Sequence, residues 1–215
     1  MARTRAHDYD DKRRAILHRT AELFARHGFT GASITKIAEA CGISKALLYH
    51  YYRDKDAVLF DILAEHLSLL VAAVEAAAAT RASARERLHA IVAALLDSYR
   101  DADAEHQVQI TSLKLLPPEQ QEQLKDMERT LVRIFAEALA AAVPHAAADR
   151  SLLMPLTMSL FGMLNWHYLW FREGKGLSRA DYARLATELV LSGAANAVAA
   201  VRPADGRVRR RMETA

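Results

Sequence analysis

The stretch ITKIAEACGISKALLYHYYRDKD, which runs from Ile34 to Asp56, decides how the first part of the chain folds. Apolar residues recur in it at spacings of three and four, and Gly42 interrupts the pattern after Cys41. This predicts two short helices joined by a tight turn. Ser44 can cap the second helix, and Ile43 can fill the angle between the two. Such a pair of helices is a helix-turn-helix.

The second of these helices carries polar and aromatic side chains on one face. Lys45, Tyr49 and His50 point outward in the predicted helix, whereas Leu48 and Tyr52 can pack inward. A short protruding helix of this kind is what reading of the DNA major groove requires. Helical pairs with a glycine turn also occur in bundles that bind no nucleic acid, so the pattern alone leaves that alternative open.

Charge is unevenly distributed along the 215 residues. Residues 1–60 hold eleven Lys/Arg and seven Asp/Glu, residues 61–201 hold thirteen and seventeen, and residues 202–215 hold five and two. The three segments therefore carry +4, −4 and +3. A basic front segment on an acidic body favours nucleic-acid binding at the front.

Helical periodicity continues along the rest of the chain, and no strand-like alternation persists. Capping residues, prolines and glycines set the expected boundaries. We therefore expect an all-α protein with an N-terminal three-helix head at residues 1–56. A fourth helix from about residue 55 connects it to a larger helical body at 57–201, and a flexible basic tail follows at 202–215. The predicted helices cover about residues 10–28, 33–41, 44–51, 54–80, 83–96, 105–115, 118–144, 149–172 and 178–200.

The composition excludes several classes of protein and site. An apolar content of 52% excludes a wholly disordered chain, and the single cysteine, Cys41, excludes an internal disulfide or a thiolate-rich metal site. No secretory signal peptide is visible, so a cytoplasmic location is expected. The uncharged stretch 151–171 is long enough to span a bilayer, but Pro155, Asn165 and His167 favour a buried or interface helix.

Motifs of the common enzyme classes are missing from the sequence. It contains no nucleophile elbow, no dinucleotide-binding glycine motif and no phosphate-binding loop. The nine histidines include no H-E-x-x-H motif. Adjacent residues on a helix point about 100° apart, so neighbouring Glu and His side chains cannot bind one metal ion together. We therefore expect no enzymatic activity, no metal and no cofactor.

The segment from about residue 11 to residue 60 resembles the TetR family of one-component transcriptional repressors. Tyr52 stands where the family usually has a phenylalanine, a departure that adds only a hydroxyl group. The resemblance implies a DNA-binding head, a helical effector-binding and dimerisation body, and a homodimer. The residues that carry it are FARHGF at 24–29, Thr35 with Ile37-Ala38, GIS at 42–44, LYHYY at 48–52, and Lys55.

The resemblance also implies roles for residues of the head. In the family, the residues that match Thr35 and Tyr49 donate to backbone phosphates, and Lys55 lies where a cation and a helix start approach the backbone. For Lys45 and His50, a solvated side chain with no role in DNA binding is the alternative. The candidates for contacts with base edges are Ser44, Lys45 and His50.

A second resemblance lies in the body. The segment FGMLNWHYLWFREGKGLSRADYA, which starts at Phe161, looks like the C-terminal signature of family members that respond to CoA thioesters. Trp166 and Trp170 share a helix face, although such a helix also occurs as plain core or dimer interface. The acidic body argues against binding of the CoA phosphates, so a drug-like aromatic effector is the alternative. The residues expected to line an apolar effector pocket are Leu113, Phe161, Asn165, Trp166 and Trp170.

Dimerisation is expected through the last two helices of each subunit, where Gly193, Ala194 and Ala197 permit close approach. Two heads would then lie roughly 34–36 Å apart, one helical turn of DNA, on a pseudo-palindromic operator. An effector would release the DNA by favouring another separation of the heads. The expected function is a ligand-responsive homodimeric repressor. The alternatives are a helical enzyme or interaction protein without DNA binding, and a regulator of an efflux gene.

Overall fold

The computed structural model describes residues 2–144 and 150–201, which form helices joined by turns and loops. No strand occurs in these two ranges, and the predicted all-α class is confirmed. The basic tail predicted at 202–215 lies outside the described residues.

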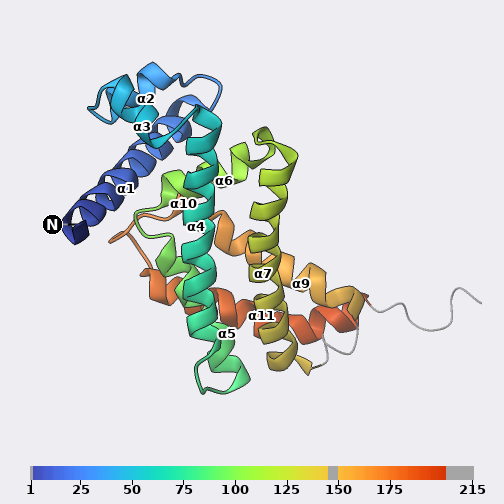
Figure 1. The fold of residues 1–215 in the computed structure, drawn as a ribbon. Coiled ribbons are helices and arrows are strands. Elements are labelled where there is room, and N and C mark those ends of the chain that lie inside the picture. The colour runs from blue at the N-terminus through green and yellow to red at the C-terminus, as the bar shows by residue number, and fades with distance from the viewer. Residues whose placement is uncertain (1, 145–149, 202–215) are drawn as a thin grey trace, which may run out of the picture. The chain divides into compact units, whose positions relative to one another are not determined.

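Four helices at the start of the chain have the predicted order (Figure 1), and three of them begin at side-chain caps. The hydroxyl oxygens of Ser33 and Ser44 lie 3.3 and 3.1 Å from the amide nitrogens three residues further on, and Asp54 Oδ1 makes the same contact at 2.8 Å. Each cap satisfies an amide that the first helical turn leaves without a partner. The four helices are α1 (Ala2–His27), α2 (Ile34–Ala40), α3 (Lys45–Tyr51) and α4 (Lys55–Ala78).

Helix α1 is longer than predicted, because it begins at Ala2 and not near Asp10. An ion pair between His7 Nδ1 and Asp11 Oδ2, at 2.7 Å, joins successive turns of the added segment. In addition, the ring of Tyr9 stacks on that of Tyr51 in α3, with centroids 4.6 Å apart. This contact between residues far apart in the sequence gives the added turns a tertiary partner, which helix propensity alone did not predict.

Two helices of the second half begin at side-chain caps, near the predicted boundaries at residues 83 and 178. Ser83 and Glu86 form a capping box, in which the Ser83 amide donates to the Glu86 carboxylate at 2.9 Å and the Glu86 amide donates to the Ser83 hydroxyl at 3.3 Å. The Asp181 amide donates to the Ser178 hydroxyl at 3.1 Å. The remaining helices are α5 (Ala84–Ser98), α6 (Asp103–Ser112), the 3₁₀ turn η1 (Leu113–Leu115), α7 (Pro118–Ala142), α9 (Arg150–Asn165), α10 (His167–Trp170) and α11 (Arg179–Val201).

One continuous helix was predicted for residues 149–172, and this prediction is wrong. The helix ends at Asn165, and the short helix α10 follows after Trp166. The hydroxyl of Tyr182, in α11, donates to the carbonyl oxygen of Met163 at 2.9 Å. In an unbroken helix that carbonyl would accept from the amide of His167. A side chain from another helix therefore takes over a hydrogen bond at the end of α9.

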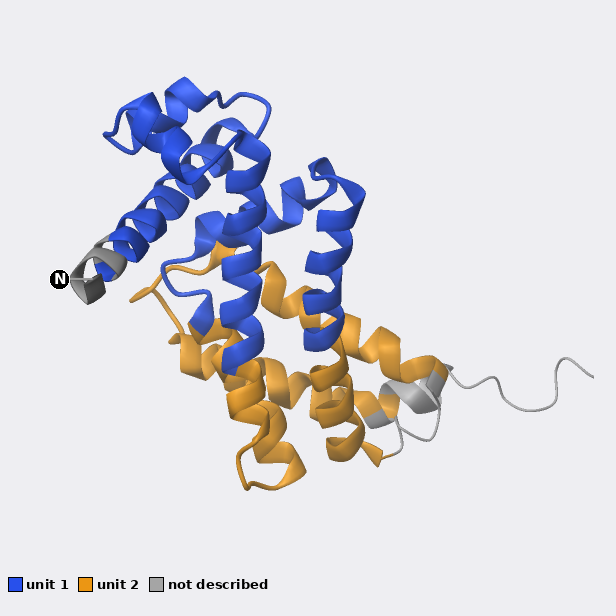
Figure 2. Ribbon diagram, in the orientation of Figure 1, with its two compact units in different colours: residues 1–73, 98–131 blue, residues 74–97, 132–215 orange. Residues whose placement is uncertain are grey.

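The chain forms two compact units (Figure 2). Unit 1 comprises residues 1–73 and 98–131, and unit 2 comprises residues 74–97 and 132–215. A division after residue 56 was expected, but unit 1 extends beyond the head because α6 packs against α1. The side-chain amide of Gln107, in α6, donates to the carbonyl oxygen of Ala25 at 3.1 Å and ties these two helices together.

Helix α4 supplies much of the apolar core of unit 1. The helix has 24 residues, and an 18-residue stretch within it has a mean hydropathy of 2.0. By length and composition alone it could therefore cross a membrane. A core helix of a water-soluble protein has the same properties. The uncharged stretch 151–171 is instead divided between α9 and α10. The α4 side chains of unit 1 that are at most 1% exposed are Val58, Leu59, Ile62, Leu63, Leu67 and Leu70.

Three polar rings lie inside the same core. The rings of His66, Tyr99 and His106 have centroids 4.2 to 6.2 Å apart, and each side chain is at most 4% exposed. Burial, helped by the neighbouring His106, lowers the pKa of His66 to about 3. The folded state therefore holds His66 as a neutral imidazole.

This burial predicts a loss of stability in acid. Below about pH 6.5 the unfolded chain protonates His66 while the folded chain does not, so the free energy of unfolding falls as the pH falls. We expect this side chain to contribute about 2 kcal/mol of loss between about pH 7.5 and pH 5. Urea denaturation of the wild type and of His66→Gln across this pH range measures the loss of stability.

His66→Gln should lose less stability on acidification than the wild type. His27→Gln, at an exposed position in α1, is the matched control and should keep the wild-type acid loss. Equal pH dependence in the wild type and His66→Gln would contradict the burial of a neutral His66.

Candidate nucleic-acid interface

The turn between α2 and α3 is built by Gly42. Its φ of +65° lies in the left-handed region, where a side chain is unfavourable. The amides of Gly42 and Ile43 donate to the carbonyl oxygens of Glu39 and Ala38, both at 3.0 Å, so the end of α2 is satisfied by the turn itself. This local geometry directs α3 away from the axis of α2.

Each of the two short helices is held in place by its one buried face. Ile37 and Ala38 of α2 are 0% and 2% exposed, and Leu48 of α3 is 0% exposed. Tyr52, directly after α3, is 5% exposed, and burial raises the pKa of its phenol. Isolated helices of seven residues are not stable in water, so this burial is what keeps α3 folded and in place.

The opposite face of α3 is open to solvent. Lys45 and His50 are exposed, and Tyr49 is 55% exposed. The imidazole of His50 lies edge-on to the ring of Tyr51, with centroids 5.7 Å apart. A lysine ammonium, a phenol hydroxyl and an imidazole on one protruding helix are groups that can donate to base edges and phosphate oxygens.

Two of the predicted hydroxyl donors lie at the helix starts. Thr35 is half-buried in the first turn of α2. Ser44 is exposed, and its oxygen already accepts the amide hydrogen of Leu47 as the cap of α3. Capping uses a lone pair of the Ser44 oxygen, so its hydroxyl hydrogen is still able to donate to another acceptor.

Lys55 has internal partners. Its Nζ donates to the carbonyl oxygens of Phe29 and Ala32, at 3.1 and 3.3 Å, and lies 4.3 Å from the centroid of the Phe29 ring. The ammonium therefore anchors the loop between α1 and α2 to the start of α4. A phosphate contact by Lys55 stays a prediction, and any such contact would come in addition to this anchoring role.

Glycine also shapes the loop that Lys55 holds. A Cβ on Gly31 would lie 2.4 Å from the carbonyl oxygen of His27, so no larger residue fits there without a shift of the backbone. The Nζ of Lys36, in α2, donates to the Gly31 carbonyl at 2.9 Å. Two lysines thus bind neighbouring carbonyls of one loop.

Contacts that sequence analysis missed position α1 against the rest of the head. The guanidinium of Arg13 donates to Asp61 Oδ2 at 2.8 Å and to Glu65 Oε2 at 2.7 Å, both in α4. Although partial burial opposes it, the pKa of Arg13 is raised by these hydrogen bonds. No signal for this pairing exists in the sequence, because 48 and 52 residues separate the partners.

The residues predicted to bind an effector have different environments. Phe161 is 7% exposed in unit 2, whereas Trp166 and Trp170 are 52% and 55% exposed there, and Asn165 is half-buried. Leu113, 8% exposed, belongs to unit 1. The described cavity of about 200 Å³ in unit 1 is lined by none of these five residues. Their role in effector binding stays a prediction.

The residues predicted for the dimer interface also differ from one another. Gly193 is exposed in α11, but Ala194 is 1% exposed within the subunit itself. The side chain of Ala197 lies outside those that the structure describes. A charge at Ala194 would therefore disturb the core of the subunit before any partner is involved, so this position is unsuited to testing dimerisation.

Two family models match this chain. Residues 16–62 match the model described as "Bacterial regulatory proteins, tetR family", and residues 81–194 match "Tetracyclin repressor-like, C-terminal domain". The second match alone covers more than half of the chain. The chain belongs to the TetR family. TetR-family membership makes it a transcriptional regulator with a helix-turn-helix DNA-binding domain, and not an enzyme.

Similar proteins of the family are known in structure and sequence. A TetR-family transcriptional regulator from Bordetella parapertussis 12822 has 35% identity and a TM-score of 0.80, over 86% of this chain and 96% of that one. The structure of AibR in complex with isovaleryl coenzyme A and operator DNA has 26% identity and a TM-score of 0.72, over 83% and 97%.

Curated relatives include repressors and an activator. The transcriptional repressor KstR2 of Rhodococcus jostii (strain RHA1) is 25% identical over 190 residues, which is 86% of this chain and 92% of KstR2. The transcriptional activator FasR of Mycolicibacterium smegmatis (strain ATCC 700084 / mc(2)155) is 33% identical over 88 residues, and this match spans only 40% of its length.

The anchoring of the loop by Lys55 predicts a stability effect without DNA. Lys55→Ala removes two charge-assisted hydrogen bonds and a cation–π contact, so the free energy of unfolding should fall by about 1–2 kcal/mol. Urea denaturation of the free protein measures the loss. Lys45→Ala, at an exposed position of α3, is the control and should leave the stability unchanged.

An unchanged stability of Lys55→Ala would contradict the anchoring role. The salt dependence of DNA binding tests the predicted phosphate contact of Lys55 separately. If Lys55→Ala removes such a contact, the slope of log K against log salt should fall in magnitude by about one unit.

Proposed function

We propose that the protein is a cytoplasmic, ligand-responsive homodimeric repressor that binds a pseudo-palindromic operator and releases it when a small hydrophobic effector binds. The observation that carries the proposal is the exposed face of α3, with Lys45, Tyr49 and His50, on a helix whose other face is buried through Leu48. Such a helix can enter a major groove without giving up its own core contacts. Tyr49, with Thr35, is proposed to bind phosphates, and Ser44, Lys45 and His50 to reach base edges.

The exposed apolar side chains of α9 and α11 support a second copy of the chain as the partner. Met154 and Met158, four residues apart on α9, are 51% and 49% exposed. Leu185 and Leu189, four residues apart on α11, are 42% and 55% exposed. Helix faces with large apolar side chains at this spacing are typical of helix-packing surfaces. Because α9 packs against α11 in unit 2, two copies can form a four-helix interface.

Glycines on the same helices favour close approach of a partner. A Cβ added to Gly162 of α9 or to Gly193 of α11 would meet no described atom within 4 Å. Neither glycine is therefore needed for packing inside the subunit. At a helix-to-helix interface, a missing side chain lets the two backbones lie close together.

A charge on the exposed face of α11 should separate the proposed dimer. Leu189→Glu would bury an unpaired carboxylate against the partner at a cost of several kcal/mol, and the subunit itself should remain folded because Leu189 is exposed in it. Sedimentation velocity should find monomers. Leu177→Glu, at a leucine before α11 that is 52% exposed, is the matched control and should remain dimeric. If Leu189→Glu dimerises with the same affinity as the wild type, the interface lies elsewhere.

Substitutions in α3 should separate phosphate contacts from base contacts. Tyr49→Phe removes one hydroxyl donor, so affinity should fall about two- to tenfold for operator and unrelated duplexes alike. Lys45→Ala should also change the preferred sequence at one position of each half-site, with a loss of about 1–3 kcal/mol of discrimination. Binding of the purified protein to a random duplex library, followed by sequencing, measures both. If Lys45→Ala lowers the affinity for all duplexes equally, Lys45 contacts the DNA backbone and not a base edge.

An acyl-CoA thioester is the effector class that we propose. AibR, with 26% identity, was solved with isovaleryl coenzyme A. In this chain, an acyl group could bury against Phe161 and the indoles of Trp166 and Trp170, with Asn165 as a hydrogen-bonding group for the thioester carbonyl.

The phosphates of CoA need cations, and the body carries a net charge of −4. Cations nevertheless gather where α10 leads into α11, since Arg172, Lys175 and Arg179 lie within eight residues. The Arg172 guanidinium donates to the carbonyl oxygen of Phe171 at 2.6 Å, and the Arg179 guanidinium donates to that of Leu96 at 3.0 Å. Arg172 and Lys175 are exposed, whereas Arg179 is half-buried, so the first two are better suited than Arg179 to bind a phosphate group.

Titration of candidate effectors against the complex of protein and selected operator tests the effector class. Short- and long-chain acyl-CoA esters should release the DNA, while the matching free acids and CoA itself should not. Arg172→Ala together with Lys175→Ala should weaken the response to acyl-CoA but not DNA binding. Release by unrelated aromatic compounds alone would replace the acyl-CoA proposal by a drug-like effector, as expected of a regulator of an efflux gene.

A further inference from the structure

Three aromatic side chains form a continuous row at the end of α3. The ring of Tyr9, in α1, stacks on that of Tyr51, with centroids 4.6 Å apart and an interplanar angle of 21°. The imidazole of His50 contacts the same Tyr51 ring edge-on, with centroids 5.7 Å apart and an angle of 88°. Aromatic pairs prefer these two arrangements, with centroids about 4.5–7 Å apart. The row therefore links α1 to a residue that is proposed to reach a base edge.

His50 is the member of this row with which DNA recognition is concerned. Its side chain is exposed on α3, and no hydrogen bond within the described residues holds its imidazole. A free side chain loses rotamer freedom when DNA fixes it, and its hydrogen bonds weaken steeply when they are misaligned. A contact that sets the ring plane beforehand reduces that loss and directs the ring nitrogens.

Tyr51 can support His50 only if its own ring is held. It is half-buried and is the last residue of α3, a helix of seven residues. Because helix ends fray, the last residue of so short a helix needs a contact from outside the helix. Tyr9 provides that contact through one face of the Tyr51 ring.

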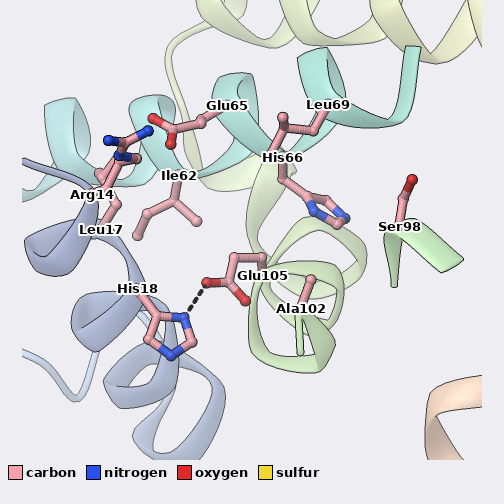
Figure 3. A pocket seen from close by; sticks show the side chains of 10 residues that line it. All are labelled: Arg14, Leu17, His18, Ile62, Glu65, His66, Leu69, Ser98, Ala102 and Glu105. Carbon is pink, nitrogen blue, oxygen red and sulfur yellow. Dashed lines mark hydrogen bonds and ion pairs between the residues drawn. The ribbon is translucent and has the colours of Figure 1, made fainter. Parts of the chain in front are cut away.

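The helix that carries Tyr9 is itself anchored within unit 1. One turn further along α1, the guanidinium of Arg13 donates to two carboxylates of α4, at 2.8 and 2.7 Å. Further along α1, His18 Nδ1 lies 2.9 Å from Oε1 of Glu105, in α6, as Figure 3 shows. The position of the Tyr9 ring relative to the head is therefore defined by contacts that do not involve α3.

Tyr9 is not part of the core that keeps the head folded. It is 41% exposed, and it lies before residue 16, where the match to the family model of the head begins. The buried residues Leu48 and Tyr52, which hold α3 in place, do not depend on its ring. Loss of the Tyr9 ring should therefore leave the head folded while it removes the support of Tyr51.

We propose that Tyr9, acting through Tyr51, is a positioning residue for DNA recognition: the stacked rings hold the His50 imidazole in the orientation in which it reaches a base edge. This inference rests on the proposed function, in which His50 contacts a base. It adds a residue from outside the helix-turn-helix to those that set the preferred operator sequence. Tyr9 itself needs no contact with DNA.

Sequence preference is the first readout. Binding to a random duplex library, followed by sequencing, should show that His50→Ala loses preference at particular positions of each half-site. Tyr9→Ala should lose preference at the same positions, by about two- to tenfold, and at no others. Tyr9→Phe keeps the ring and should retain the wild-type preference.

Two further variants separate positioning from a general structural role. Asp10→Asn, at the next exposed position of α1, is the matched control and should keep the wild-type preference. The double variant of Tyr9→Ala and His50→Ala should be as selective as His50→Ala alone, because Tyr9 acts through His50. A uniform fall in the affinity of Tyr9→Ala, with unchanged preference, would overturn the proposal.

NMR of the free protein tests the same link without DNA. An aromatic ring shifts the signals of nearby protons, so the His50 imidazole signals should move in Tyr9→Ala and stay in place in Tyr9→Phe. Those of the exposed His27 should stay in place in both variants. Unmoved His50 signals in Tyr9→Ala would overturn the proposal.

The two readouts distinguish failure of this proposal from failure of the proposed function. If His50→Ala keeps the wild-type preference while Tyr9→Ala moves the His50 signals, the base contact assigned to His50 is wrong, and the positioning role fails with it. If His50→Ala loses preference and Tyr9→Ala does not, the positioning role alone is wrong.

Discussion

The burial of α4 is the interaction on which unit 1 depends. Val58, Leu59, Ile62 and Leu63 are at most 1% exposed, and burial of each such side chain is worth about 1.5–3 kcal/mol. Hydrophobic burial has little directionality, however, so it does not by itself set the angle at which α1 crosses this helix. The two hydrogen bonds from Arg13 to α4 supply that direction, because guanidinium and carboxylate groups bind in a defined plane.

The DNA-binding surface is a consequence of this arrangement. Helices α2 and α3 have seven residues each, too few to persist alone, and they remain folded because Ile37 and Leu48 are fully buried. Lys55, in the first turn of α4, holds the loop that leads into α2. The exposed side chains of α3, which we propose to contact DNA, are therefore held in place by contacts made on the far side of the helix-turn-helix.

Polar groups are enclosed in the same core. His66, Tyr99 and His106 are enclosed together, and the nearby Glu105 keeps one oxygen without a partner among the described residues. Buried polar atoms without partners destabilise a fold, and apolar side chains of the same size would remove that cost.

The sequence by itself determined the features of this protein that depend on neighbours in the chain. Ser33, Ser44 and Asp54 cap helices because a cap needs only the amides of the next turn, and Gly42 makes its turn through its own φ angle. Two of these residues, Gly42 and Ser44, are among those that carry the family resemblance of the head.

Only the tertiary structure decided which distant groups meet. The Lys55 ammonium binds carbonyls 23 and 26 residues away, and the Tyr182 hydroxyl binds the Met163 carbonyl where α9 ends. Ala194 proved to be buried within its own subunit. Helical periodicity predicts that a face is covered, but it carries no information about which atoms cover it. Partners, burial and cavities are set by how helices pack in three dimensions, and packing joins residues without regard to their separation in sequence.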